Sequence, residues 1–252
     1  MAPKEKNNYE DVIDEYSEVL SDKYDTKLVN HGPVYYEGRK HYFYSARLDK
    51  KGVLTPTAII RAGAHGEEFD GTHALLKLLE EEEDLVNNFS MLIFPCGNPW
   101  GYVYGTRNVM IESNKFFNEK VAPHTVHYVR KKIKGAVDIA IDLHGDNRDE
   151  GFYIYQRKRV GLPDLAKKTV AQVKKKFPVT RTKVIDGDKI IKGVINCSGQ
   201  KEGTFEEHCY DKGAKYSFTP EFAGWISQKK RIDCGYLLLK YLLSSYFQFV
   251  KR

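Results

Sequence analysis

The stretch TAIIRAGAHGEEFDG, residues 57–71, decides the fold. It begins with a short apolar run that ends in glycine, which is typical of a buried strand. The polar turn AHGEE follows, and a leucine-rich helix is predicted directly after it, over 71–83. A strand, a turn and a helix in this order predict an α/β unit whose polar turn lies at the carboxyl end of the strand.

The same alternation of strands and helices continues along the chain. Residues 8–21 predict an amphipathic helix, and the tyrosine-rich segment 33–48 alternates as strands do. Further strands are predicted at 90–96, 136–144, 152–156 and 215–221, and further helices at 122–133, 162–177 and 231–249. We therefore predict an α/β fold with a mixed, largely parallel twisted sheet and helices on both faces, in a single domain over 1–252. Ligand sites in such sheets lie beyond the carboxyl ends of the strands.

The bulk composition excludes several classes of protein. Hydrophobic residues make up 41% and charged residues 29% of the 252 residues, as in a globular protein rather than a disordered one. The net charge of +6 comes from scattered basic residues without a binding motif, so we expect no nucleic-acid partner. No segment approaches the roughly 20 consecutive apolar residues that cross a bilayer, so we expect no membrane partner. Nothing in the sequence indicates an oligomeric state.

The cysteines and the N-terminal segment favour a reducing compartment. Cys96, Cys197, Cys209 and Cys234 form no CxxC pair, which argues against a cysteine zinc site. The first residues, MAPKEKNNYEDVIDEY, lack the apolar stretch of a secretory signal. We therefore expect a cytoplasmic protein with free thiols.

His65, Glu68 and His144 are predicted to bind a metal ion. The H-x-x-E spacing places His65 on the turn and Glu68 at the start of the helix, so that both converge on one point, and His144 ends a later strand. Two imidazoles and one carboxylate leave zinc an open position for water, as a catalytic site requires. The alternative is that these are ordinary polar residues at strand ends. Glu67 is the adjacent alternative carboxylate, but it breaks the spacing.

Six sequence elements occur in the order seen in zinc carboxypeptidases. They are HGEE (65–68), GNPWG (97–101), Arg107, ESNKFF (112–117), DLH (142–144) and KYSFTPEF (215–222). From about 57 to 225 the chain resembles the zinc carboxypeptidase family, which includes aspartoacylase-like and succinylglutamate desuccinylase-like relatives. The resemblance implies a metallohydrolase that uses one zinc ion to remove the C-terminal residue of a peptide.

The resemblance also implies the roles of residues around the metal. Glu221 matches the catalytic glutamate, the general base on the attacking water and then the proton donor to the leaving amine. Arg107 matches the arginine that stabilises the oxyanion. Glu112 matches the acidic residue that orients the first zinc histidine, although aspartate is usual there. Asp142 shares the face of His144 on its strand and is the alternative for that role.

The chain departs from the family among the substrate-binding residues. Asn114 and Lys115 match an Asn-Arg pair that holds the substrate's terminal carboxylate, but lysine cannot make the two-pronged contact of arginine. The position of the family's capping tyrosine falls near Gly199, and Tyr210 is the nearest tyrosine downstream. Glu206 matches the position that sets specificity at the pocket floor, which implies a preference for basic C-terminal residues. The alternative is that Glu206 lies on a solvated edge.

Two other functions stay open. An amidohydrolase that acts on N-acyl amino acids would share the H-x-x-E pattern, the arginine and the SNKFF-like segment, and the compact length suits it. KYSFTPE and the block between Gly203 and Gly213 favour a peptide substrate instead. A non-catalytic binding module would lack a metal ligand or the catalytic glutamate, and the sequence contains all of them.

Overall fold

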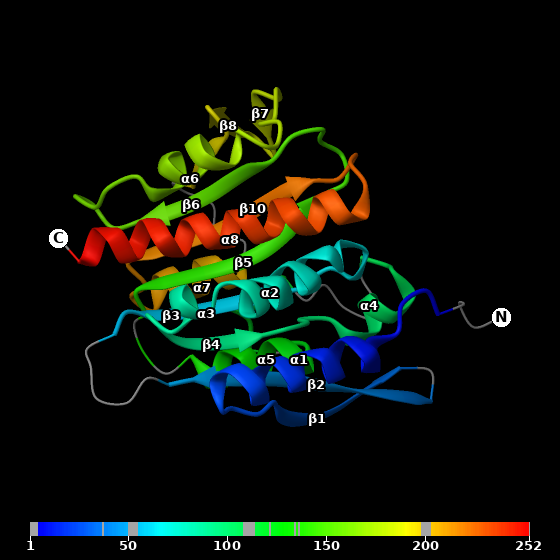
Figure 1. Ribbon diagram of the computed structural model, residues 1–252. Helices are drawn as coiled ribbons and strands as arrows, with labels where there is room; N and C mark the ends of the chain where they lie inside the picture. The colour runs from blue at the N-terminus through cyan, green and yellow to red at the C-terminus, as the bar shows by residue number, and fades with distance from the viewer. Residues whose placement is uncertain are drawn as a thin grey trace.

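The structure, a computed structural model, contains one mixed ten-stranded sheet in the order β1-β2-β4-β3-β5-β10-β6-β9-β8-β7 (Figure 1). It describes residues 5–36, 38–49, 55–107, 114–120, 122–133, 135, 137–197 and 203–251. The strands are β1 (Val29–Tyr36), β2 (Arg39–Leu48), β3 (Thr57–Ala62), β4 (Ser90–Phe94), β5 (Ile139–Asp146), β6 (Tyr153–Lys158), β7 (Val184–Ile185), β8 (Asp188–Ile191), β9 (Val194–Asn196) and β10 (Tyr216–Ala223). The predicted mixed α/β sheet is confirmed.

Parallel pairing is concentrated at the centre of the sheet. Strands β4, β3, β5 and β10 run parallel to one another. On one side β2 and β1 continue the sheet with antiparallel pairing, and on the other side β6 lies antiparallel to β10. Because parallel strands end at the same edge, the carboxyl ends of the four central strands meet there. The register places Glu221 of β10 directly beside His144 of β5.

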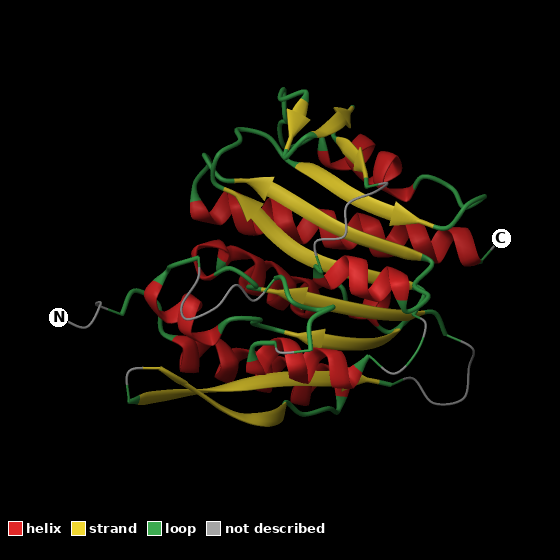
Figure 2. Ribbon diagram, turned by 180° about the vertical axis from the view of Figure 1, so that it is seen from behind, coloured by secondary structure: helices red, strands yellow, loops and turns green. Residues whose placement is uncertain are grey.

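Helices cover both faces of the sheet. They are α1 (Tyr9–Tyr24), α2 (Asp70–Glu81), α3 (Glu83–Val86), α4 (Pro99–Tyr104), α5 (His124–Lys132), α6 (Leu165–Val173), α7 (Phe205–Asp211), α8 (Gln228–Val250) and the 3-10 helix η1 (Gly66–Glu68). Figure 1 shows α1, α2, α6 and α8 in front of the sheet, and Figure 2 views the opposite face, which α5 and α7 cover. The molecule therefore has three layers, with an apolar core on each side of the sheet.

The alternation of side chains along the central strands divides them between the two cores. Ile60 of β3 and Ile141 of β5 belong to the core beneath α2 and α8, whereas Ile59 and Ala140 belong to the core beneath α5 and α7. Side chains two residues apart on a strand share a face. Asp142, His144 and Asp146 thus follow Ala140 onto the α7 side, and they form a polar row that leads to the carboxyl edge.

Most predicted elements are present with boundaries that differ by a few residues. The helix predicted at 71–83 is α2, the strand predicted at 215–221 is β10, and the closing helix predicted at 231–249 is α8. The elements that the sequence did not predict are short: η1, α3, α4, α7 and the strands β7 to β9. The four cysteines are free thiols. Among the described residues, no helix combines the length and apolarity that crossing a membrane requires.

Candidate active site

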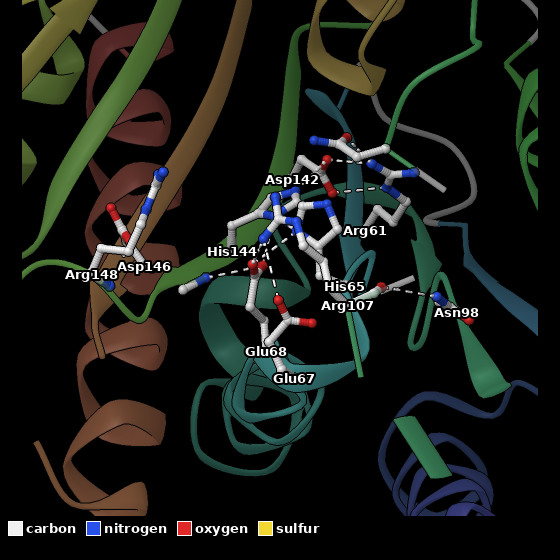
Figure 3. Close-up of polar contacts among 12 residues, drawn as sticks. Arg61, His65, Glu67, Glu68, Asn98, Arg107, Asp142, His144, Asp146 and Arg148 are labelled. Atoms are coloured by element: carbon white, nitrogen blue, oxygen red, sulfur yellow. Dashed lines mark hydrogen bonds and ion pairs between the residues drawn. The ribbon is translucent and has the colours of Figure 1, made fainter. Parts of the chain in front are cut away.

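His65, Glu68 and His144 lie together at the carboxyl edge of the sheet (Figure 3). All three are buried, and one ligand atom of each lies within 4.8 Å of the others. His65 Nδ1 is 2.8 Å from Glu68 Oε1 and 3.2 Å from His144 Nδ1, and the latter is 2.8 Å from Glu68 Oε2. Neighbouring ligand atoms in a tetrahedral zinc site stand roughly 3.3 Å apart, because the bonds are about 2.0–2.1 Å long. The three side chains fit such an ion.

Glu68 is the anionic member of the cluster. Burial raises the pKa of Glu68, but His144 and His65 outweigh it and lower that pKa to about 2. Glu68 is therefore an anion at neutral pH. Burial lowers the pKa of His144, but Asp142 and Glu68 outweigh it and raise that pKa well above its usual value, so a metal ion bound here would displace a proton from this imidazole. Glu67 lies outside the cluster: its Oε1 accepts a hydrogen bond of 3.3 Å from Arg107 Nη1. The same Arg107 nitrogen is 3.1 Å from Glu68 Oε1, so the guanidinium lies beside the cluster with about half of its surface exposed.

The turn that carries His65 packs against the GNPWG segment. A Cβ atom on Gly66 would lie 1.9 Å from the carbonyl carbon of Gly101, so the two backbones touch and a larger residue does not fit. The Asn98 side-chain oxygen accepts a 2.9 Å hydrogen bond from the Gly101 amide at the start of α4, and the backbone amide of Asn98 donates to the Gly63 carbonyl. The segment after β4 thus supports the turn after β3.

Asp142 holds His144 on the side away from Glu68. Its Oδ2 is 2.9 Å from His144 Nε2, which leaves Nδ1 of that ring facing the cluster. Arg61 contacts both oxygens of Asp142. Burial raises the pKa of Asp142, but Arg61 and His144 outweigh it and hold that pKa well below its usual range. Asp142, the predicted alternative for orienting the first zinc histidine, His65, instead contacts His144; the first candidate, Glu112, lies outside the described residues.

Glu221 lies on β10 beside His144, as the register requires. Burial raises its pKa well above the ordinary value of a glutamate; Glu68 and Asp146 raise it further, while His144 and Arg107 oppose the shift. A carboxyl group whose pKa is raised accepts a proton more readily than an ordinary glutamate and can give it back during one reaction. The position of Glu221 is therefore suited to proton transfer next to the cluster.

One cavity of about 680 Å³ contains the cluster and the residues predicted to bind substrate. Asn114, Lys115, Glu206 and Glu221 all line it. Glu206 Oε1 lies 2.5 Å from the hydroxyl of Thr204, whereas its buried Oε2 has no hydrogen-bond partner among the described residues. Burial and then Asp142 raise the pKa of Glu206. Among the described residues, no arginine or lysine forms an ion pair with this carboxyl group.

Sequence reasoning missed several cavity residues. Tyr153 and Tyr155 of β6 line the cavity, and their hydroxyls donate to Asp146 Oδ2 at 2.8 Å and to Asp186 Oδ2 at 3.2 Å. Their spacing of two residues on a predicted strand is the signal that could have identified them. Tyr210 does not line the cavity; its hydroxyl donates to the Lys158 carbonyl at 3.3 Å. The position of the family's capping tyrosine, near 199, lies outside the described residues.

Four arginine and lysine side chains also line the cavity. They are Arg107, Lys115, Arg148 and Arg157. The backbone amide and the Nε of Arg148 both donate to Asp146 Oδ1, at 2.8 and 3.1 Å (Figure 3). Arg157 is mostly buried and lies 3.6 Å from Glu207. The cavity therefore offers cations as well as the carboxylates of the cluster to a substrate.

Comparison with known proteins identifies the family. The model of the succinylglutamate desuccinylase/aspartoacylase catalytic domain matches residues 54–231, so the chain belongs to this family. The chain is also 32% identical, over 112 residues, to carboxypeptidase B of Helicoverpa zea. That match covers 40% of this chain and 26% of the relative, so the chain spans about a quarter of the curated relative that it matches.

Solved structures share the fold. A protein of Shewanella baltica proposed to be a metallopeptidase superposes with a TM-score of 0.81 at 20% identity, covering 94% of this chain and 92% of its own. The metallo-carboxypeptidase of Burkholderia cenocepacia has a TM-score of 0.67 at 16% identity, with 96% and 70% covered. Carboxypeptidase A of Helicoverpa armigera has a TM-score of 0.66 at 16% identity, with 98% and 75% covered. The chain therefore has a metallocarboxypeptidase-like fold, and the predicted family is confirmed.

Proposed function

We propose that this protein is a zinc-dependent metallocarboxypeptidase that removes a basic residue from the C-terminus of a peptide, with residues 1–252 acting as one catalytic domain. The observation that carries the proposal is that Glu221 and the cluster of His65, Glu68 and His144 share one cavity with Glu206. A metal centre, a proton acceptor and a carboxylate at the floor are the parts that such a reaction requires.

In the proposed mechanism His65, Glu68 and His144 hold the ion. When bound, zinc supplies a Lewis acid that polarises the scissile carbonyl and promotes ionisation of a water molecule. Glu221 accepts the proton of the attacking water and passes it to the leaving nitrogen, a role that its raised pKa supports. Arg107, beside Glu68, donates to the oxygen on which negative charge develops.

The substrate's C-terminal residue is bound at the other end of the cavity. We assign its carboxylate to the Asn114 amide and the Lys115 ammonium, which both line the cavity. A lysine or arginine side chain of the substrate would reach Glu206, whose Oε2 has no hydrogen-bond partner in the described part of the chain. An ion pair there would offset the cost of burying that carboxylate, and this supports a preference for basic residues.

The test is a digest of a peptide library by zinc-loaded protein, read by mass spectrometry, beside metal analysis of wild type and His65→Ala. We expect release of single C-terminal lysine and arginine, and loss of both zinc and activity in the variant. Full zinc occupancy in His65→Ala would overturn the metal assignment. Equal release of leucine and phenylalanine would overturn the basic preference.

Glu206→Gln tests the specificity assignment directly. Because glutamine has the same shape without the charge, we expect kcat/KM for peptides ending in lysine to fall by about 10- to 100-fold, as for a lost hydrogen bond to a charged group. For peptides ending in leucine, kcat/KM should change little. Asp188→Asn is the matched control, because Asp188 also lines the cavity but is exposed. If both variants lower kcat/KM equally, the preference comes from the overall negative charge of the cavity and not from Glu206 itself.

An N-acyl amino acid amidohydrolase is the second candidate. The match of the succinylglutamate desuccinylase/aspartoacylase catalytic domain to 54–231 favours it, and so do the four cationic side chains in the cavity, which suit substrates with several carboxylates. The metal centre and Glu221 would keep their roles. Hydrolysis of N-acyl amino acids, with no cleavage of peptides by the same zinc-loaded preparation, would favour this function over the first.

A further inference from the structure

Arg61 is a buried arginine at the centre of the site that the mechanism above does not use. It lies on β3, four residues before His65, and only 1% of it is exposed. We propose that Arg61 is a positioning residue that fixes His144 for the metal and Asn114 for the substrate at the same time. The inference rests on the proposed function and adds a physical connection between metal binding and substrate binding.

Arg61 acts on the predicted metal ligand His144 through Asp142. Arg61 Nε donates to Asp142 Oδ1 at 2.8 Å, and Nη2 contacts Oδ2 (Figure 3). A guanidinium that grips both oxygens fixes the plane of the carboxylate. Asp142 is fully buried, and its Oδ2 is also 2.9 Å from His144 Nε2. The fork of Arg61 therefore determines, through Asp142, where His144 directs its Nδ1.

The second end is the residue assigned to the substrate carboxylate. Nη2 of Arg61 also donates to Asn114 Oδ1 at 2.6 Å. Because the amide oxygen accepts from arginine, the amide NH₂ points away from the guanidinium, and an NH₂ group donates hydrogen bonds. Asn114 lines the cavity, so this orientation presents a donor to a carboxylate. Arg61 thereby selects which end of the amide faces the substrate.

Packing holds the guanidinium in this position. Its central carbon lies 5.0 Å from the ring centre of Phe117 and 4.8 Å from that of Phe205. Phe117 follows Asn114 by three residues, and Phe205 directly precedes Glu206 in α7. A planar guanidinium can stack between two rings and still make three hydrogen bonds, whereas an ammonium cannot. The contacts therefore require arginine, not only a positive charge.

A purely structural role predicts different behaviour. Buried ion pairs often contribute little net stability, and breaking one leaves an uncompensated charge that destabilises the whole fold. If Arg61 only neutralised Asp142, then Arg61→Lys would retain that charge and change the melting temperature at most. If Arg61 positions both ends, the same variant weakens zinc binding and peptide binding even where the protein stays folded.

The experiment measures each binding event without the other by titration calorimetry. Zinc is titrated into peptide-free protein, and a blocked dipeptide ending in lysine is titrated into zinc-free protein, which cannot hydrolyse it. For Arg61→Lys we expect both dissociation constants to rise by about 10- to 100-fold, as for other residues that orient metal ligands. Asp142→Asn should weaken zinc binding alone, and Asn114→Ala should weaken dipeptide binding alone.

Arg159→Lys is the matched control for lost arginine packing. Arg159 stacks on Tyr210 at 4.0 Å and donates to backbone carbonyls outside the cavity, so its variant should change neither affinity. Should Arg61→Lys fail to fold, the double variant Arg61→Met, Asp142→Asn removes the charge pair together, and loss of both affinities there supports the proposal. A change in at most one affinity overturns it. Wild type that binds neither zinc nor dipeptide would instead contradict the proposed function.

Discussion

Glu221 lines the cavity, and its surroundings there make it costly to ionise. Its carboxyl group shares the site with Glu68 and Asp146, both of which raise its pKa beyond the effect of burial. The folded protein therefore holds the proton of Glu221 more tightly than the unfolded chain does. Ionisation of Glu221 therefore lowers the stability of the folded protein, although a general base has to be ionised to accept a proton.

Glu221→Gln should therefore stabilise the metal-free protein at high pH while it abolishes turnover. Because the pKa of Glu221 is raised in the folded state, its protonated carboxyl group contributes fully to stability below pH 4.5, the ordinary pKa of a glutamate. That contribution is lost as the pH rises through the pKa of the folded state. We expect a higher melting temperature for the variant at about pH 8, and no difference below about pH 4.5. Activity should fall by about 100- to 10,000-fold. Equal melting temperatures at pH 8 would contradict the burial argument.

Residues with a sequence pattern could be predicted, and those defined only by contacts could not. His65 and Glu68 lie on one turn, so their spacing alone indicates convergence. Arg61 lies alone in an apolar strand, and nothing local distinguishes it from a strand residue at the surface. Its partner Asp142 lies 81 residues away in sequence. Only the pairing of β3 with β5 brings the two together.

Asp138 connects several strands and a helix at the edge of the sheet opposite the site. It precedes β5, and its Oδ2 accepts a 2.7 Å hydrogen bond from the Thr57 amide at the start of β3. Its Oδ1 accepts from the Tyr246 hydroxyl of α8 at 2.8 Å and lies 2.7 Å from Lys215 Nζ, next to β10. One carboxylate thus connects three central strands and the closing helix.

Asp138→Ala should lower the free energy of unfolding by about 2–3 kcal/mol, because the variant leaves the Thr57 amide without this acceptor. Burial raises the pKa of Asp138, but Lys215 and the hydrogen bonds lower it overall. A lowered pKa gives stability that is present above the ordinary value of 3.8 and lost as the pH falls below it. Urea unfolding at about pH 7 and pH 3 should show the deficit shrinking with acid.

Asp233→Ala is the comparison for that variant. Asp233 also pairs with a lysine, Lys77, at 2.5 Å, but both side chains are partly exposed. Pairs of this kind contribute about 0–1 kcal/mol. A deficit for Asp138→Ala no larger than that for Asp233→Ala would show that the hydrogen bonds of Asp138 contribute little.

The elements that sequence reasoning missed are too short to show a period. Strand β7 has two residues and β9 has three, so no alternation can be seen in them. Helix α7 has seven residues, and glycines lie on either side of it. Its position beside β10 and β5 depends on burial of Phe205 and Cys209, which a single sequence does not reveal.

At the scale of the molecule, the apolar cores and the site are separate. Both cores lie between the sheet and its helices, whereas the metal cluster lies at the carboxyl edge. The alternation of strands and helices predicted these layers correctly. The order of the strands follows from long-range pairing, and the position of β10 between β5 and β6 had no local signal.

Removal of metal should therefore leave the fold intact. After chelation we expect unchanged far-ultraviolet circular dichroism, lost activity and a lower melting temperature. Zinc restored at about 100 times its dissociation constant should add about 2.7 kcal/mol, because only the folded state binds it. His65→Ala should show no such response to zinc. Loss of helical signal on chelation would show that the ion is needed to build the sheet.

The contact between Gly66 and Gly101 limits how this chain can be changed by mutation. Neither position has room for even a methyl group: a Cβ atom on Gly66 would lie 1.9 Å from the Gly101 backbone, and one on Gly101 would lie 2.6 Å from the Asn98 side chain and 2.9 Å from the Thr106 carbonyl oxygen. A library that randomises the metal turn, or the loop after β4, would lose most of its members through collisions between the two segments. Variants with a new substrate range are therefore to be sought on the β7–β8 side of the cavity, where Asp188 is exposed.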